Sequence, residues 1–235
     1  MWKKKKERGG HLNRTTVESY LPFWNKITET EKEILHTAEK RSYPKGSVIS
    51  YGEENCIGLL VVISGRLRVS TVAEEGREIS LLRLLERDIC LFSATCIFRS
   101  IQSDLIVTAE EDTQVWHIPV SAYKKVMEQS AVVANYTTEL MASYFSDMVW
   151  LMDQVINKKL DSRLAAFLLE ESELEGQEQI EMTQEQIAHY LGSAREVVSR
   201  MLKYFQQEGM VRSERGCIRL LDQERLRETA RESLR

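Results

Sequence analysis

Two hydrophobic patterns divide the chain near Pro119. Between Arg41 and Pro119, short apolar and β-branched runs alternate with Gly-bearing turns, which is typical of antiparallel hairpins in a sandwich or barrel. This region is therefore predicted to form a β-roll. Its strands include Val48–Tyr51, Leu59–Ile63, Arg66–Val72 and Ile79–Leu84, and its turns include Lys45-Gly46, Tyr51-Gly52-Glu53, Ser64-Gly65 and Glu75-Gly76-Arg77.

The second pattern is helical. Val120–Asn157 contains no Gly or Pro and carries apolar residues at helical intervals, which predicts one long helix or two. The stripe is too long for one small domain to cover, so we expect it to pair with a second copy of the chain; packing on the chain's own β-roll is the alternative. The stripe contains Val133 and Val155, and the predicted dimer interface is Leu140, Tyr144, Met148 and Leu151.

Two helix starts follow each other near the C-terminus. Thr183 and Gln186 fit a capping box that opens a helix ending near Leu191-Gly192, and Ser193 with Glu196 repeats the pattern. The second helix should end near Glu208-Gly209. Two short helices joined by a Gly-containing turn predict a helix-turn-helix.

The second of these helices divides by face. Its apolar residues follow helical spacing and should point inward, and its polar residues share an outward surface that suits the edge of a DNA major groove. Arg can bind guanine O6 and N7, Glu can accept from cytosine N4, and Ser suits either base. The predicted inward set is Ala194, Val197, Val198, Met201, Leu202 and Phe205, and the predicted base-reading set is Arg195, Glu196, Ser199 and Arg200.

A hairpin is predicted after this helix, with strands at Met210–Arg212 and Cys217–Leu221. Such a wing would bring Arg212, Arg215 and Arg219 to DNA phosphates. The predicted contacts to the DNA backbone are Thr183, Lys203, Arg212 and Arg215. Two alternatives stay open: Glu196 serves only as a cap, or the arginines form an ordinary solvated face.

Composition narrows the classes of function. The chain has 235 residues, 43% of them hydrophobic and 29% charged, with a formal net charge of -4. This composition excludes a small disulfide scaffold and a protein that coats nucleic acid indiscriminately. The basic start at Lys3–Arg8 leads into no apolar segment, so we expect a cytoplasmic protein without a membrane span. The four cysteines show no Cys-x-x-Cys spacing and should be free thiols, with Cys90 and Cys96 either buried or redox-sensing.

Two segments carry a resemblance to a known family. Met182–Ala188 and Gly192–Arg200 resemble the DNA-recognition signature of the Crp/Fnr bacterial transcription regulators, with weaker support from Ile63–Leu67, Gly76–Glu78 and Asp88. The resemblance covers roughly Leu21–Leu226. It implies an α+β fold: a cyclic-nucleotide-binding-like β-roll (jelly roll), a long dimerisation helix and a C-terminal winged helix-turn-helix.

The same resemblance implies a function. Such a protein would bind double-stranded DNA as a homodimer on an inverted repeat whose half-sites share a TGA-like core. A small-molecule effector would control it, and it would contact RNA polymerase if it activates. The predicted domains are a basic, disordered tail at residues 1–18, an effector domain at 19–125, a dimerisation helix at 126–157 and a DNA-binding domain at 158–235. An acidic loop is expected at Glu170–Gln179.

The effector region departs from the family pattern. Family members that bind cyclic nucleotide use a Gly-Glu pair and an Arg-Ser or Arg-Thr pair, but this chain has Arg87–Phe92 and Ser103-Asp104 at those places. Asp104 would repel a phosphate, so cyclic AMP is not expected, although Arg99-Ser100 keeps a nucleotide effector open. The effector thus stays unknown, and its predicted pocket lies between the roll and the long helix. The pocket residues are Leu91, Phe92, Arg99, Tyr136 and Tyr144.

The positions of the cysteines and histidines bear on other cofactors and on an enzymatic role. No cysteine precedes Cys56, which argues against the family's N-terminal iron-sulfur cluster, and no haem or metal is expected. The alternative function is a metal-dependent, cupin-like β-roll enzyme with an accessory winged helix. Its metal site would need clustered histidines, whereas His11, His36, His117 and His189 fall in four different predicted elements.

Overall fold

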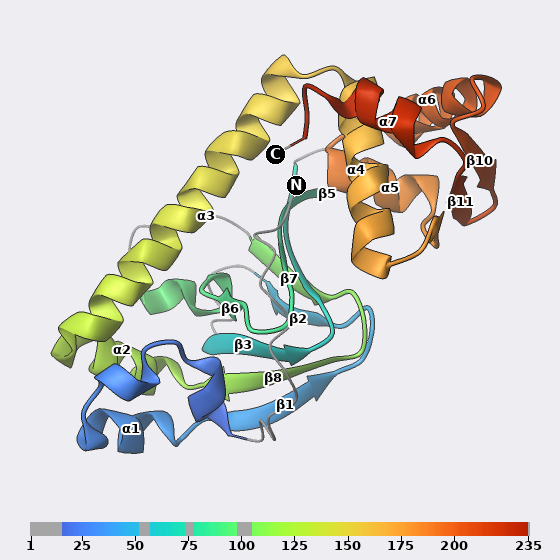
Figure 1. Ribbon diagram of the computed structural model, residues 1–235. Helices are drawn as coiled ribbons and strands as arrows, with labels where there is room; N and C mark the ends of the chain where they lie inside the picture. Colours follow the sequence, from blue (N-terminus) through green and yellow to red (C-terminus); the bar gives the residue numbers. More distant parts are fainter. Residues whose placement is uncertain (1–15, 52–56, 74–77, 98–104, 235) are drawn as a thin grey trace. The chain divides into compact units, whose positions relative to one another are not determined.

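The computed structural model describes residues 16–51, 57–73, 78–97 and 105–234 (Figure 1). The chain divides into two compact units, one comprising the described residues up to Val72 with Leu81–Asp147, the other the described parts of Ala73–Ser80 and Met148–Arg235. None of the described helices is both long and apolar enough to span a membrane.

Short strands and one-turn helices dominate the chain before residue 119, as the turn spacing predicts. Two α-helices, the second of them long, then follow. In chain order these elements are η1 (Val17–Tyr20), η2 (Trp24–Lys26), α1 (Glu29–Leu35), β1 (Glu39–Tyr43), β2 (Val48–Tyr51), β3 (Leu59–Ser64), β4 (Leu67–Val72), β5 (Glu78–Leu84), β6 (Ile89–Cys90), η4 (Phe92–Ile97), β7 (Leu105–Ala109), β8 (Thr113–Ile118), α2 (Val120–Gln129) and α3 (Ala131–Asn157).

The strands form the predicted β-roll. The described residues make one four-stranded sheet in the order β1-β8-β3-β6 and another in the order β2-β7-β4-β5. Strand β3 lies at the centre of the core, because Leu59, Leu60, Val61 and Val62 are all 0% exposed. Strand β7 instead alternates buried and half-buried residues, the period-two pattern of a strand with one covered face. The fold class expected from the sequence is confirmed.

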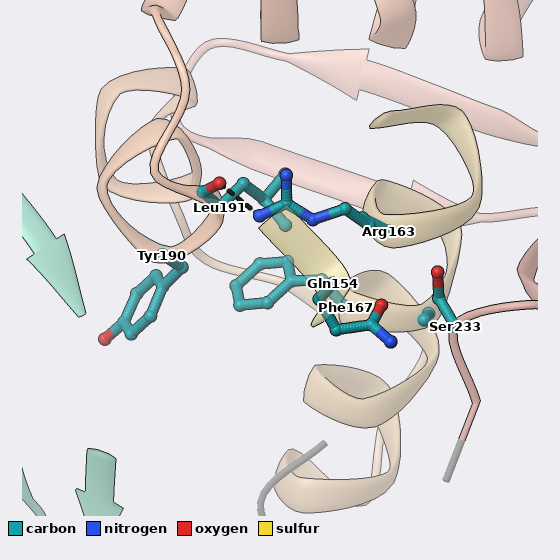
Figure 2. A pocket seen from close by; sticks show the side chains of 7 residues that line it. Gln154, Arg163, Phe167, Tyr190, Leu191 and Ser233 are labelled. Carbon is teal, nitrogen blue, oxygen red and sulfur yellow. Dashed lines mark hydrogen bonds between the residues drawn. The ribbon is translucent and has the colours of Figure 1, made fainter. Parts of the chain in front are cut away.

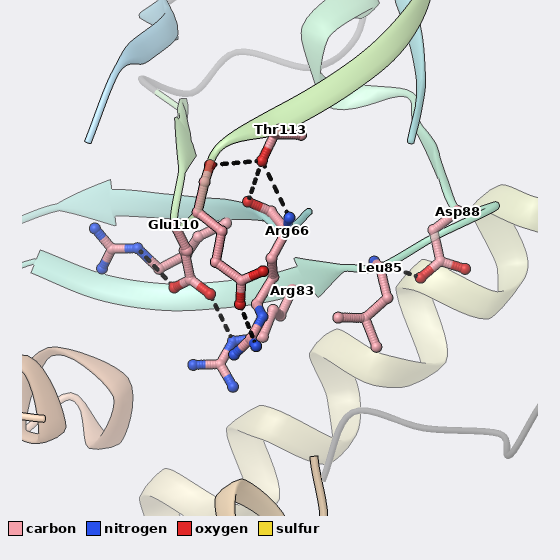
Figure 3. A network of polar contacts seen from close by, with 8 residues as sticks. Arg66, Arg83, Leu85, Asp88, Glu110 and Thr113 are labelled. Carbon is pink, nitrogen blue, oxygen red and sulfur yellow. Dashed lines mark hydrogen bonds and ion pairs between the residues drawn. The ribbon is translucent and has the colours of Figure 1, made fainter. Parts of the chain in front are cut away.

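A charged network lies inside this roll (Figure 3). The carboxylate of Glu110 lies 2.9 Å from Nε of the buried Arg83 and 3.5 Å from Nε of Arg68. Thr113 Oγ1 accepts a hydrogen bond of 3.1 Å from the backbone N–H of Arg66. A carboxylate shared by two guanidinium groups offsets part of the desolvation cost of burying them. Strands β4, β5 and β7 are thereby linked by charge as well as by apolar packing.

The second unit contains the C-terminal helices and a small sheet in the order β10-β11-β9. Its core is apolar and includes Leu164, Leu168, Ile187, Leu202 and Phe205, each 0% exposed. Its elements are α4 (Leu160–Glu175), β9 (Gln179–Ile180), α5 (Gln184–Leu191), α6 (Arg195–Gln207), β10 (Val211–Glu214), β11 (Cys217–Leu220) and α7 (Gln223–Ala230).

Three predicted boundaries are wrong. The tail was expected to reach residue 18, but Val17 is 3% exposed inside η1. The dimerisation helix was expected from residue 126, but the extended backbone of Ser130 separates α2 from α3, so the long helix begins at Ala131. The acidic loop was expected from Glu170, but α4 continues to Glu175, because Glu171 and Ser172 are still buried on one face of the helix; Gly176, in the left-handed conformation, ends it.

The structure also corrects the predicted interface on α3. Tyr144 is 9% exposed and Leu151 is 7% exposed in the single chain, so neither offers much surface to a second copy. Leu140 and Met148 are half-buried. The helix carries a second apolar stripe, and that stripe is the exposed one: Phe145 is 71% exposed, Val149 49%, Met152 59% and Ile156 71%.

Two turn glycines allow a controlled test of the roll. Gly65 and Gly46 have nearly the same φ, +83° and +84°, but a Cβ at Gly65 would lie 2.6 Å from the backbone oxygen of Asp112, whereas a Cβ at Gly46 meets nothing within 4 Å. Gly46→Ala should cost about 1 to 2 kcal/mol through left-handed strain alone. Gly65→Ala should cost about 1 to 3 kcal/mol more, because a backbone clash is added. Urea unfolding of both variants measures the difference, and equal midpoints would contradict the close approach.

Candidate nucleic-acid interface

Helix α5 begins with the predicted capping box. The backbone N–H of Gln186 donates to Thr183 Oγ1 at 3.2 Å, and the backbone N–H of Thr183 donates to Gln186 Oε1 at 2.8 Å. Two amide groups that the helix cannot pair internally are therefore satisfied. The Thr183 hydroxyl also donates to Gln186 Oε1 at 3.0 Å. This hydroxyl already serves the cap, so its predicted contact to DNA would have to compete with these bonds.

The second predicted capping box is wrong. Helix α6 begins at Arg195 with Ala194 as its N-cap, and no side chain caps it. The reason lies in the turn: Gly192 adopts the left-handed conformation at φ 58°, and the backbone N–H of Ser193 donates back to the carbonyl of Ala188 at 2.9 Å. Ser193 thus closes α5 instead of opening α6. Glu196 therefore makes no capping hydrogen bond. Ala194, which was expected to point inward, is exposed.

The faces of α6 otherwise divide as predicted. Val198, Leu202 and Phe205 are each 0% exposed, and Val197 and Met201 are half-buried. The opposite surface carries the predicted base-reading side chains. Arg195, Glu196 and Arg200 are exposed, as is Lys203, while Ser199 is half-buried.

The predicted wing is the antiparallel pair of β10 and β11. Gln206 of α6 accepts a hydrogen bond of 3.0 Å from the backbone N–H of Ser213, which ties the wing to the helix. Arg212 and Arg219 lie directly opposite each other in the register and are both exposed. Like charges at such a position destabilise a hairpin. An anion between them would remove this repulsion.

The cations of α6 and the wing share a further property. Within the described ranges, no carboxylate oxygen lies within 4.0 Å of any of them. Arg225, in the same unit, does have a partner, Glu208 at 2.8 Å. Exposed cations without internal partners are available to an external anion. The set is Arg195, Arg200, Lys203, Arg212, Arg215 and Arg219; we call it the cationic surface.

The predicted effector residues only partly come together. Phe92 stacks on Tyr144 with ring centroids 5.4 Å apart, and the Tyr144 hydroxyl donates to the carbonyl of Ile89. Tyr136 packs instead against Phe23 at 5.2 Å. Leu91 is buried, and Arg99 lies outside the described residues. The part of this region that the structure describes is therefore aromatic and apolar.

The neighbouring polar groups have structural roles. Asp88 Oδ2 accepts a hydrogen bond of 2.9 Å from the backbone N–H of Leu85, which closes the turn before β6 (Figure 3). Cys90 is 0% exposed, and burial raises the pKa of its thiol to about 11. Because the thiolate is the reactive species, Cys90 is a poor redox sensor. The side chain of Cys96, like Cys56, Ser103 and Asp104, lies outside the described residues.

The histidines form no metal centre in the part of the chain that the structure describes, where no three His, Cys, Asp or Glu side chains are grouped to hold a metal ion. His117 is buried, and its Nε2 contacts the carbonyl of Ile57. His189 Nδ1 lies 3.6 Å from Glu78. His11 lies outside the described residues.

The chain is similar to known proteins along most of its length. Residues 40–130 match the cyclic nucleotide-binding domain, and residues 162–229 match the Crp-like helix-turn-helix domain. A crystal structure of a protein of the Crp/Fnr family from Eubacterium rectale is 48% identical, with a TM-score of 0.88, and the match covers 91% of this chain and 99% of that one. The transcriptional regulator SdrP of Thermus thermophilus is 27% identical over 72% of this chain and 82% of its own length. The cyclic AMP receptor protein of the same organism is 24% identical over 89% and 96%.

Proposed function

This chain belongs to the Crp/Fnr family of transcription regulators, which are not enzymes, and we propose that it binds an inverted-repeat operator as a homodimer. The observation that carries the proposal is the cationic surface. Helix α6 is held by its buried face, so its charged face points to solvent. A polyanion supplies the partners that those cations lack in the described part of the chain.

The roles of the individual side chains follow from their chemistry. We assign Arg200 to a guanine, through O6 and N7, and Glu196 to a neighbouring cytosine amine. Arg195 favours a second guanine, and Ser199 completes the base-reading set. On the wing, Arg212 and Arg215 are placed on phosphates, where they fix the register without reading sequence. Thr183 and Lys203 are the further backbone contacts.

A second copy of the chain is proposed to cover the exposed stripe of α3. Phe145, Val149, Met152 and Ile156 follow one another at intervals of four, three and four residues, the spacing of the a and d positions of a heptad repeat. Thr138 and Ala142 continue the same repeat toward the N-terminus, and both are exposed. Two-fold pairing along this seam would present two recognition helices about 34 Å apart, one turn of DNA.

The effector of the β-roll is proposed to be a small molecule other than a cyclic nucleotide. The match to the cyclic nucleotide-binding domain supports a ligand of some kind. A cyclic phosphate needs cationic or amide donors, whereas Phe92 and Tyr144 stack together and Asp88 is engaged in a turn. Contact with RNA polymerase would apply if the protein activates transcription.

The base-reading assignment predicts different losses for two arginines. Arg200→Ala should cost about 1 to 3 kcal/mol on the best operator and relax the preference at one base pair. Arg215→Ala should weaken binding to all sequences alike and reduce the salt slope by about 1. Arg227→Ala, an exposed arginine of α7, serves as the control. Selection from random duplexes followed by titration at several salt concentrations measures both effects. Recovery of no inverted repeat, or unchanged preferences for Arg200→Ala, would contradict the assignment.

The seam on α3 predicts the effect of one buried charge. Val149→Lys would place two cations in the apolar seam of the dimer, which should weaken association by about 3 kcal/mol, or roughly 100-fold. Ser143→Lys adds the same charge at an exposed position off the seam and should leave association unchanged. Sedimentation equilibrium compares the two variants. A Val149→Lys protein that stays dimeric at micromolar concentration would place the interface elsewhere.

The effector proposal predicts that cyclic AMP does not bind at micromolar concentration. Calorimetric titration of the full chain should give no saturable heat. A dissociation constant near 1 μM, or about -8 kcal/mol, would contradict the proposal and would return Arg99 to consideration as a phosphate ligand.

A further inference from the structure

A small cavity lies within the C-terminal unit. The C-terminal end of α3, helix α4, the end of α5 and the chain terminus enclose it (Figure 2). Its volume is about 10 Å³, which is room for one particle near the size of a water molecule. It is lined by Gln154, Arg163, Phe167, Tyr190, Leu191 and Ser233, among others.

The guanidinium of Arg163 is the one charge in this lining. Arg163 is 9% exposed, and its Nη2 donates to the carbonyl of Leu191, the last residue of α5. Its Nε has no hydrogen-bond partner, and no carboxylate of the described residues lies within ion-pair distance of the guanidinium. Burial lowers the pKa of Arg163, because the charged form loses hydration. One carbonyl at a helix end compensates only part of a buried positive charge.

The other polar groups of the lining can also donate. Gln154 is 2% exposed, and its carboxamide makes no hydrogen bond with the described residues. Ser233 is 1% exposed and accepts a hydrogen bond of 3.0 Å from Ser162 Oγ, which leaves its own hydroxyl proton free to donate. Among the described residues, the cavity therefore offers a cation, an amide N–H and a hydroxyl, and no acid. A water molecule could accept these hydrogen bonds but would leave the charge of Arg163 uncompensated.

We propose that this cavity binds a single halide ion, such as chloride, against Arg163 and Gln154. The small volume excludes phosphate and sulfate, and the donor set excludes a cation. The site lies behind the end of α5, so the bound ion would stabilise the attachment of the helix-turn-helix to α4. This inference does not depend on the proposed operator or effector.

Anomalous diffraction tests the site directly. Crystals of the full chain are soaked in sodium bromide, and data are collected at the bromine absorption edge. An anomalous peak in the cavity, within about 3.5 Å of the Arg163 guanidinium and the Gln154 amide, is the expected result. An ordered water without anomalous signal at that place would overturn the proposal.

Thermal unfolding gives an independent test in solution. At constant ionic strength, replacing sodium gluconate with sodium chloride should raise the Tm of the full chain by about 3 °C in a saturable manner, because the ion binds only the folded state. Gln154→Leu removes one donor without stranding a charge, and it should reduce that rise to less than half. Gln177→Leu, at an exposed position outside the cavity, should keep the full rise.

No chloride-specific rise in the wild type, or an equal rise in Gln154→Leu, would overturn the proposal. If Gln154→Leu does not fold, the bromide experiment decides.

Discussion

The burial of one face of α6 is the interaction on which the DNA-binding surface depends. Val198, Leu202 and Phe205 are fully buried in the core of the C-terminal unit, and each such side chain contributes about 1.5 to 3 kcal/mol. Turning the helix by one residue would expose them, so the helix has one orientation. Arg195, Arg200 and Lys203 are consequently held in solvent, and none of them forms an ion pair with a carboxylate of the described residues. The pairing of Gln206 with Ser213 extends the same constraint to the wing.

Several features of the single chain are unfavourable until a partner is present. The opposed arginines of the wing repel each other, the cations of α6 have no carboxylate partner among the described residues, and a heptad of apolar side chains on α3 faces water. These features call for different partners: the charges require a polyanion, and the apolar stripe requires another apolar surface. With a formal net charge of -4, the chain as a whole has no basic excess, so the cationic surface is a local feature. DNA can supply the polyanion, and a second copy of the chain is the partner proposed for the apolar stripe.

The core of the β-roll adjoins its predicted effector region. This core centres on β3 and on the charged network around Glu110, and β3 pairs with β6, which contains Cys90. Among the described residues, this region has the aromatic side chains of Phe92 and Tyr144 and the buried thiol of Cys90, whereas the family's nucleotide-binding pattern uses groups that hold a phosphate. A shared fold does not by itself imply a shared ligand.

The sequence by itself determined the features that depend on near neighbours. Glycine spacing fixed the strands of the roll, and the capping box at Thr183 with the periodicity of α6 fixed the helix-turn-helix, because these signals act within a few residues.

The tertiary structure decided the rest. Helical spacing marked one apolar stripe on α3, through Leu140, Tyr144 and Leu151. Only packing between segments distant in sequence shows that Tyr144 is covered and that Phe145, outside that stripe, is exposed. Helix α6 begins at Arg195, later than the capping pattern predicted, because the backbone N–H of Ser193 donates to the carbonyl of Ala188. The burial of Arg163 likewise follows from segments that meet only in the folded chain, since periodicity describes one element and burial describes what surrounds it.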